Sequence, residues 1–304
     1  MIRPRWGGVV GQKTAGRFCL LMLALPGLWM GVYFIYPIYK TLQLSFYDWN
    51  GLTTQIPLWV GWENYRAILT DRVIPLALGN NLKVFFQGAI VQLILSFILG
   101  VLIVHARSRM GRVFLVISYV PHMIPLAVVG FLCSVVFAGT GPLQAMLAGV
   151  GFSGMDFDWL GNEKTAFWAI VLTGLWASLG FTVLCYTASL KEVPDELVEA
   201  ARVEGACLFR IALHVLLPFT WSMSRSLFVL STIGAFLTFE LVWVMTLRTG
   251  GPLNSAQTLV SWLYTHMNDM NFGYAAALSA VVFALTLVGT VCAYAPVLLG
   301  RRRR

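Results

Sequence analysis

Charged and aromatic side chains inside apolar stretches are the first candidates for chemistry in this sequence. Glu240 lies in an apolar run, with Thr232, Phe236 and Trp243 at helical spacing before and after it. A carboxylate beside aromatic rings can bind the hydroxyls of a sugar while the rings cover its apolar face. A hydrated or paired charge near the outer membrane boundary is the other interpretation, and the sequence leaves both open.

Two further places combine polar or aromatic side chains with apolar surroundings. Trp176 shares a helical face with small residues, and Phe181 lies beside that face. Small residues there favour close helix packing over ligand contact. His122 stands between Pro121 and Pro125. A proton relay is one interpretation of this histidine, and a hydrogen bond to carbonyls freed by the prolines is the favoured one.

No arrangement of residues predicts catalysis, metal binding or nucleotide binding. The sequence has no GxxxxGK[ST] phosphate loop. The four histidines are dispersed and the five cysteines form no CxxC pair, which argues against an active site, a metal site or a disulfide framework. These residues are His105, His122, His214, His266, Cys19, Cys133, Cys185, Cys207 and Cys292.

A polar segment, residues 189–218, carries the strongest local pattern. Pro194 suits a helix start, and the acidic residues after it complement the positive end of a helix dipole. Leu197, Ala200, Ala201 and Glu204 then share one side, where another protein can approach, and Gly205 ends the helix. A second amphipathic piece, Leu208 to Leu217, follows. A helix pair that merely joins two membrane spans is the alternative.

The composition places these residues in a membrane protein. Hydrophobic residues make up 58% of the 304 residues and charged residues only 11%, with a mean hydropathy of +0.77. A membrane helix needs about 20 apolar residues. Six runs qualify, which predicts an all-α bundle of six transmembrane helices in one domain, 1–304, because continuous apolar runs favour helices over a barrel. The runs are 18–38, 84–105, 113–137, 166–188, 226–247 and 275–299.

The basic residues predict the orientation. Of the 21 Lys and Arg residues, 15 fall on the side that holds both termini, the 106–112 loop and the 189–225 loop. By the positive-inside rule both termini are cytoplasmic, and the net charge of +8 needs no nucleic acid partner. Membrane lipid is an expected partner, and the tail Arg301 to Arg304 is interpreted as a topological anchor. The first run lacks a cleavage site and is expected to be retained.

The outer loop, 39–82, is rich in aromatic residues. An interfacial belt and a docking surface for an external partner are both consistent with this composition.

The segment 189–218 also resembles a known family. Glu199-Ala200-Ala201, Gly205 and Leu217-Pro218 stand at the spacing of the EAA loop of permease subunits in binding-protein-dependent ABC importers. The resemblance implies that this loop, between helices four and five, forms a coupling helix that sits on an ATPase subunit. The residues that it assigns to coupling are Glu199, Ala200, Ala201, Arg202 and Gly205. Glu204 stands where the family has Asp.

Other motifs resemble the carbohydrate-type permeases of the maltose, multiple-sugar and glycerol-3-phosphate kind. They include Tyr36-Pro37, Val60-Gly61-Trp62, Asn80-Asn81, Gly250-Gly251-Pro252 and Phe272-Gly273-Tyr274. The resemblance implies a solute cavity near mid-membrane between two permeases. The substrate-pathway candidates on this chain are Trp176, Phe181, Ser231, Phe236, Glu240 and Trp243.

The resemblance further implies a second homologous permease, two ATPase subunits that bind ATP and Mg, and an external solute-binding protein, in the bacterial inner membrane. This chain itself is expected to bind no cofactor and to catalyse no reaction. The spans offer no Lys or Arg well inside the membrane, which favours a neutral sugar over glycerol-3-phosphate or another polyol phosphate. An ion-coupled carrier is the rival class, and it would need internal symmetry and paired intramembrane charges, neither of which is evident.

Overall fold

The chain forms an almost entirely helical bundle. This computed structural model describes residues 12–52, 54–106, 108–152 and 158–300. The described helices longer than two turns are α1 (Gln12–Met30), α2 (Tyr36–Leu44), α3 (Glu63–Thr70), α4 (Val73–Phe86), α5 (Leu93–Ala106), α6 (Arg109–Met123), α7 (Leu126–Phe137), α9 (Ala166–Leu190), α10 (Asp195–Val203), α13 (Trp221–Phe236), α15 (Leu259–Asn268) and α16 (Phe272–Gly300).

Shorter elements join them. They are the π-helical turns η1 (Gly31–Ile35), η2 (Gln87–Gln92), η3 (Ala148–Phe152) and η4 (Ala212–Leu216), the helices α8 (Pro142–Leu147), α11 (Leu208–Ile211), α12 (Leu217–Phe219), α14 (Glu240–Met245) and η5 (Pro252–Asn254), and the strands β1 (Tyr47–Asp48) and β2 (Leu58–Trp59). The two strands pair antiparallel, with Tyr47 opposite Trp59.

The all-α prediction is confirmed, whereas the count of six spans is not settled by length and composition. Among the described residues, five helices are long and apolar enough to cross a membrane. A sixth appears if 208–219 and 221–236, which meet at 74°, are taken as one bent span. The predicted runs 166–188 and 275–299 match α9 and α16 closely.

Four of the predicted runs differ from the observed helices. The first run, 18–38, lies inside a longer helix that extends from Gln12 to Leu44 through α1, η1 and α2. The second helix starts at Val73, eleven residues before the predicted 84, and runs through α4, η2 and α5. The third run, 113–137, is divided at Ile124, because the ring of Pro125 disfavours the helical conformation of the residue before it and Ile124 is extended. The fifth run, 226–247, starts earlier, at Trp221, and is interrupted between Phe236 and Glu240.

The buried side chains of Asn81 and Thr258 stabilise the interruption in the fifth run. Asn81 Nδ2 donates to the Ala235 carbonyl at 2.6 Å, and Asn81 Oδ1 accepts from the Leu259 N–H at 3.0 Å. Thr258 Oγ1 donates to the Thr238 carbonyl at 2.7 Å. Since unpaired buried backbone groups are costly, these bonds stabilise the non-helical turn between α13 and α14.

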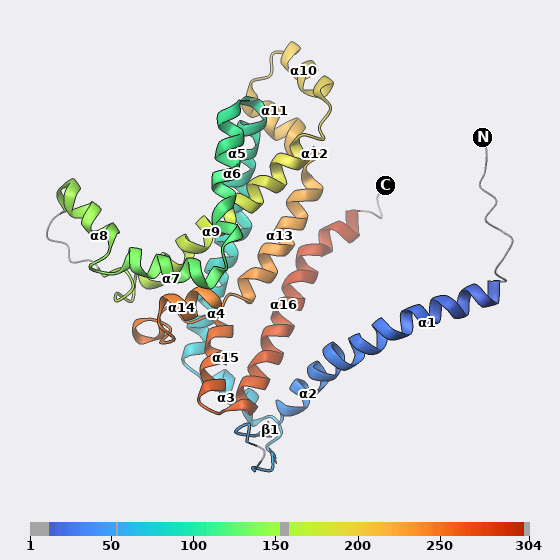
Figure 1. Cartoon of the computed structure of the whole chain (residues 1–304), viewed down its shortest axis with the longest axis vertical. Helices are drawn as coiled ribbons and strands as arrows, with labels where there is room; N and C mark the ends of the chain where they lie inside the picture. Colours follow the sequence, from blue (N-terminus) through green and yellow to red (C-terminus); the bar gives the residue numbers. More distant parts are fainter. Residues whose placement is uncertain (1–11, 53, 107, 153–157, 301–304) are drawn as a thin grey trace.

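Three buried apolar clusters lie along the bundle. One joins α5, α9 and α11–α13 beneath α10, one joins α3, α4, α15 and α16, and one joins α9 to α14. Figure 1 shows α10 at one end of the molecule and α3, β1 and α15 at the other, with the long helices between them. The apolar core is thus divided among the two ends and the middle of the bundle.

The helix formed by α1, η1 and α2 stands away from the bundle. Its apolar part, Leu21–Leu44, has no buried residue in its most hydrophobic window. In Figure 1 it leaves the bundle beside β1 and diverges from α16. A lipid or a partner subunit must therefore cover these side chains.

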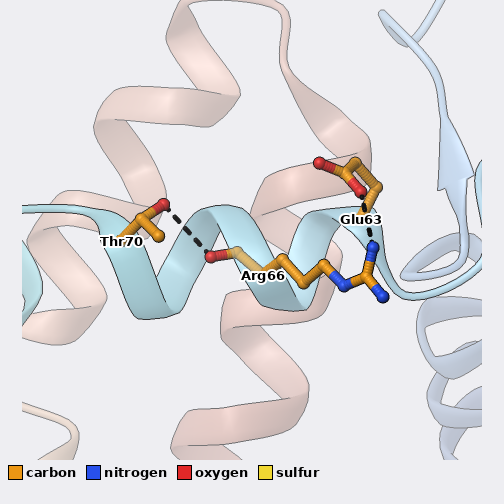
Figure 2. A network of polar contacts seen from close by, with 3 residues as sticks. All are labelled: Glu63, Arg66 and Thr70. Carbon is orange, nitrogen blue, oxygen red and sulfur yellow. Dashed lines mark hydrogen bonds and ion pairs between the residues drawn. The ribbon is translucent and has the colours of Figure 1, made fainter.

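The end of the bundle that carries β1 is rich in aromatic contacts. Phe46 packs against the rings of Trp59, Trp62 and Tyr65, with centroids 5.1 to 5.6 Å apart. On the exposed face of α3, Arg66 lies 3.6 Å from Glu63 and Thr70 Oγ1 donates to the Arg66 carbonyl (Figure 2). This ion pair is solvent-exposed and contributes little to stability.

Candidate functional site

The segment 189–218 forms a short helix, α10, that projects from the end of the bundle (Figure 1). The helix starts at Asp195, one residue after the predicted start, with Pro194 in extended conformation before it. Asp195 and Glu196 occupy its first turn, where they complement the helix dipole.

Gly205 ends α10 as the sequence predicts. It has a φ of +81°, a conformation that favours glycine. Its N–H donates to the Arg202 carbonyl, and the Ala206 N–H donates to the Ala201 carbonyl at 3.0 Å. This pair of bonds is a Schellman motif, which directs the chain back toward the bundle.

The coupling candidates divide between two faces of α10. Glu199 and Ala200 are exposed, whereas Ala201 packs, together with Val198, against the apolar cluster beneath the helix. The sequence placed Ala201 on the contact side, and the structure places it on the bundle side. Val203, which sequence reasoning missed, is 90% exposed and shares the outer face with Leu197, which is 48% exposed.

Arg202 connects α10 to the end of α5. Its Nη2 donates to His105 Nδ1 at 3.0 Å. Both residues line a cavity of about 320 Å³ between α10 and the bundle, together with Asp195 and Glu199. This hydrogen bond and the packing of Val198 and Ala201 connect α10 to the apolar cluster formed by α5, α9 and α11.

A second feature, the pocket, lies among α6, α7, α9, η2, α13 and α14. It has a volume of about 810 Å³. The breaks at Ile124–Pro125 and at Leu237–Phe239 both border it. These breaks turn helix ends toward the space, as expected where non-helical backbone lines a cavity at membrane depth.

Three of the six predicted pathway residues line this pocket. They are Phe181, Ser231 and Glu240. The other three lie elsewhere. Phe236 is buried and packs on α16, where a Cβ added to Gly289 would lie 3.3 Å from its ring. Trp243 packs against Phe239 and Tyr264, and Trp176 is 53% exposed and is not a lining residue.

A polar group on the pocket wall was missed by sequence reasoning. Gln92 is buried; its Oε1 accepts from Ser178 Oγ at 3.1 Å and from Gln87 Nε2 at 3.3 Å. Gln92 Nε2 reaches Thr182 Oγ1 at 3.3 Å. The signal was available, because Ser178 and Thr182 lie four apart on α9 and two glutamines interrupt an apolar helix.

His122 also lines the pocket. Its ring stacks on Phe181, with centroids 4.9 Å apart and an interplanar angle of 21°. The imidazole and the phenyl ring therefore cover one another in a stacked pair that forms part of the pocket wall.

The charges around the pocket are few. Of the described residues that line it, Glu240 is the one carboxylate, and none is Lys or Arg. In the described part of the chain no group of three or more His, Cys, Asp or Glu residues could hold a metal ion. Cys133, Cys185, Cys207 and Cys292 are free thiols. The pocket offers amides, hydroxyls, the three rings of His122, Phe181 and Phe239, and one carboxylate to a ligand.

Comparison with known proteins defines the class of this molecule. Residues 92–303 match the family described as binding-protein-dependent transport system inner membrane component. The chain belongs to this family. It is a multi-pass membrane protein, a permease subunit of an ABC transporter.

Several curated relatives extend over almost the whole chain. It is 30% identical to the diacetylchitobiose uptake system permease protein NgcF of Streptomyces coelicolor, over 94% of this chain and 83% of the relative. It is 30% identical to the arabinooligosaccharides transport system permease protein AraP of Bacillus subtilis, over 84% of this chain and 81% of the relative. It is 28% identical to the probable ABC transporter permease protein YurN of Bacillus subtilis, over 88% of this chain and 91% of the relative.

The fold matches that of a solved importer. A chain of a bacterial ABC transporter involved in the import of the acidic polysaccharide alginate superposes with a TM-score of 0.77, at 18% identity, over 93% of this chain and 97% of the other. A second structure holds that transporter in complex with an alginate pentasaccharide-bound periplasmic protein, with the same TM-score of 0.77 at 18% identity, over 93% of this chain and 94% of the other.

Proposed function

We propose that this chain forms half of the translocation pathway for a neutral sugar or oligosaccharide that an external solute-binding protein delivers. The observation that carries the proposal is the lining of the pocket, which combines a stacked His122–Phe181 surface, the polar group around Gln92 and a single carboxylate. Sugar hydroxyls pair with amides and hydroxyls, while their C–H faces pack on rings.

The lack of a cationic lining residue distinguishes neutral from anionic solutes. A phosphorylated polyol needs Arg or Lys nearby to offset the cost of burying its charge. The described lining of the pocket offers neither, and Glu240 would repel an anion. The names of two curated relatives refer to oligosaccharide uptake, which also supports the neutral class.

In this proposal α10 is the coupling helix. ATP binds and is hydrolysed on two separate ATPase subunits, and their closure pushes α10 through its exposed face, Leu197, Ala200 and Val203. A second homologous permease supplies the other half of the pathway. Both chain termini then lie in the cytoplasm, on the α10 side of the bundle.

Transport by the reconstituted complex tests the pathway. Gln92→Leu removes the amide but keeps the bulk, and we expect sugar uptake to fall about tenfold, since a buried polar partner is lost. Ser134→Ala, on α7 and outside the pocket lining, is the matched control and keeps full uptake. Equal uptake in both variants would overturn the assignment of the pocket.

A cross-link tests the coupling role. Cysteine at Val203 is expected to cross-link to the ATPase subunit, whereas cysteine at Leu69, equally exposed at the opposite end, is not. Uptake without added ATP or ATPase would instead place the chain among ion-coupled carriers.

A further inference from the structure

An apolar groove on the side of the bundle lies apart from the pocket. Its volume is about 920 Å³, and it runs between α5 and the segment from α11 to α13. Ile94, Ile98 and Leu102 form one wall and Phe209 and Leu213 the other, and all five are between 40% and 73% exposed. Figure 1 shows α11, α12 and α13 descending beside α5.

One cation lines this groove. Arg225 lies on α13, one turn after Trp221, and its Nε donates to the Trp221 carbonyl at 3.3 Å. Ser224, also in the lining, accepts a hydrogen bond from Tyr186 OH at 3.0 Å. Within the described residues Arg225 forms no ion pair, and its side-chain hydrogen bond uses Nε alone. The Nη groups of Arg225 therefore remain available to an anion.

The combination of groove and cation restricts the occupant. A surface of aliphatic and aromatic side chains at membrane depth takes a hydrocarbon chain, and an unpaired cation at its edge is costly unless an anion neutralises it. The planar guanidinium matches the oxygens of a phosphate in a forked pair of hydrogen bonds. The exposed indole of Trp221, one turn away, is typical of the headgroup level of a bilayer.

We propose that this groove binds one anionic phospholipid, with an acyl chain along α5 and the phosphate on Arg225. The groove adjoins α10–α12, the side that is cytoplasmic in the proposed orientation, and the cytoplasmic leaflet carries anionic lipid. The bound lipid would fill the space between α5 and the segment that follows the coupling helix, and so would make those two parts move together.

Retention of lipid by the purified transporter complex tests the proposal. Phosphatidylglycerol and phosphatidylcholine with identical acyl chains are added in equal amounts, and native mass spectrometry counts the molecules retained. Wild type is expected to prefer phosphatidylglycerol. Arg225→Gln, which removes the charge, is expected to lower this preference roughly fivefold. Arg225→Lys is expected to restore most of it.

The control is Arg112→Gln, which makes the same change in net charge at an exposed position on α6 outside the groove. It is expected to retain the wild-type preference. An equal loss in Arg225→Gln and Arg112→Gln would overturn the proposal, because the effect would then be one of overall charge.

A photo-cross-linking residue at Ile98 identifies the occupant directly. Cross-linked phosphatidylglycerol supports the lipid site, whereas cross-linking to the second permease alone assigns the groove to a partner helix and overturns it. Neither readout involves transport, so failure of the proposed sugar pathway leaves this test intact.

Discussion

The end of the molecule that carries α3 and α15 and the end that carries α10 are held in opposite ways. At the first, two fully buried amides from α4 bond to two backbone segments, one at Ala235 and one from Ser255 to Leu259. At the second, α10 has no fully buried residue, and an exposed hydrogen bond from Arg202 connects it to α5. The first, the rigid end, is therefore expected to open less readily than the second.

The largest loss of stability is expected when the hydrogen bonds of Asn81 at the rigid end are removed. Asn81→Ala leaves the Ala235 carbonyl and the Leu259 N–H buried without partners, which costs about 3 kcal/mol of unfolding free energy. The midpoint of thermal unfolding of the purified complex measures this loss. Asn268→Ala, on the exposed face of α15 with one bond to the Tyr264 carbonyl, is the control, and its cost is expected to stay below about 0.5 kcal/mol. Similar shifts in both variants would contradict the comparison.

A substitution on the exposed face of α10 is expected to lower transport without lowering stability. Val203→Asp places a charge on the outer face of α10, and we expect uptake to fall roughly 30-fold while the unfolding midpoint stays at the wild-type value. Val203→Ile keeps the apolar surface and is expected to keep uptake. A fall in both uptake and unfolding midpoint would show that α10 is part of the packed fold.

A smaller loss is expected at the carboxylate of the rigid end. Asp71 Oδ2 accepts from Tyr274 OH at 2.7 Å and from Trp262 Nε1 at 2.8 Å, so it joins the start of α4 to α15 and α16. Asp71→Ala is expected to cost about 1 to 2 kcal/mol, because the site is only partly buried. Asp71→Asn, which keeps an acceptor, is expected to cost less. Thermal unfolding at pH 7 compares the two, and equal costs would show that the acceptor contributes nothing.

The same carboxylate is expected to make the stability of the fold depend on pH. Burial raises the pKa of Asp71, but hydrogen bonds from Tyr274, Val73 and Trp262 outweigh it, and the net pKa lies below its ordinary value of 3.8. The ionised form therefore stabilises the fold above pH 3.8, and this contribution is lost as the pH falls through the lowered pKa. Measurement in a His266→Gln background isolates the effect, since burial lowers the pKa of that histidine, and its protonation also costs stability. An acid loss that persists in Asp71→Asn would contradict the assignment.

The smallest effect is expected at the hydrogen bond between Arg202 of α10 and His105 of α5. His105→Leu removes the acceptor for Arg202, and we expect the solute transported per ATP hydrolysed to fall about twofold, because an exposed hydrogen bond contributes little. His105→Gln keeps an acceptor and is expected to retain the ratio. A loss as large as that of Val203→Asp would mean that α10 is held more firmly than its contacts indicate.

The ends of a helix can be predicted from the sequence where local hydropathy and backbone conformation determine them. They cannot be predicted where contacts with distant segments determine them. The runs at 166–188 and 275–299 and the stop at Gly205 follow from hydropathy and backbone conformation. The break before Glu240 depends on the amide of Asn81 on α4, more than 150 residues away in sequence. No local sequence pattern therefore predicts it. The same break moves Glu240 from mid-helix to a helix start.

The pathway candidates show the same limit. Helical spacing grouped Phe236 and Trp243 with Glu240. The turn between α13 and α14 separates Phe236 from Glu240, whereas Trp243 shares α14 with Glu240 but packs against Phe239 and Tyr264. Phe181 and Ser231 do line the pocket, each from an uninterrupted helix, and their place in a solute pathway stays a prediction. Ala201 was assigned to the outer face of α10 from spacing alone, and packing against the bundle reverses this.

Gly180 sets how closely α6 and α9 pack beside the pocket. A Cβ at this position would overlap the Ser118 carbonyl oxygen, so the backbones of α6 and α9 touch where the two helices cross. His122 and Phe181 extend from those same helices, about one turn or less from the crossing. Any side chain at position 180 would therefore force the two helices apart and separate the stacked rings on the pocket wall.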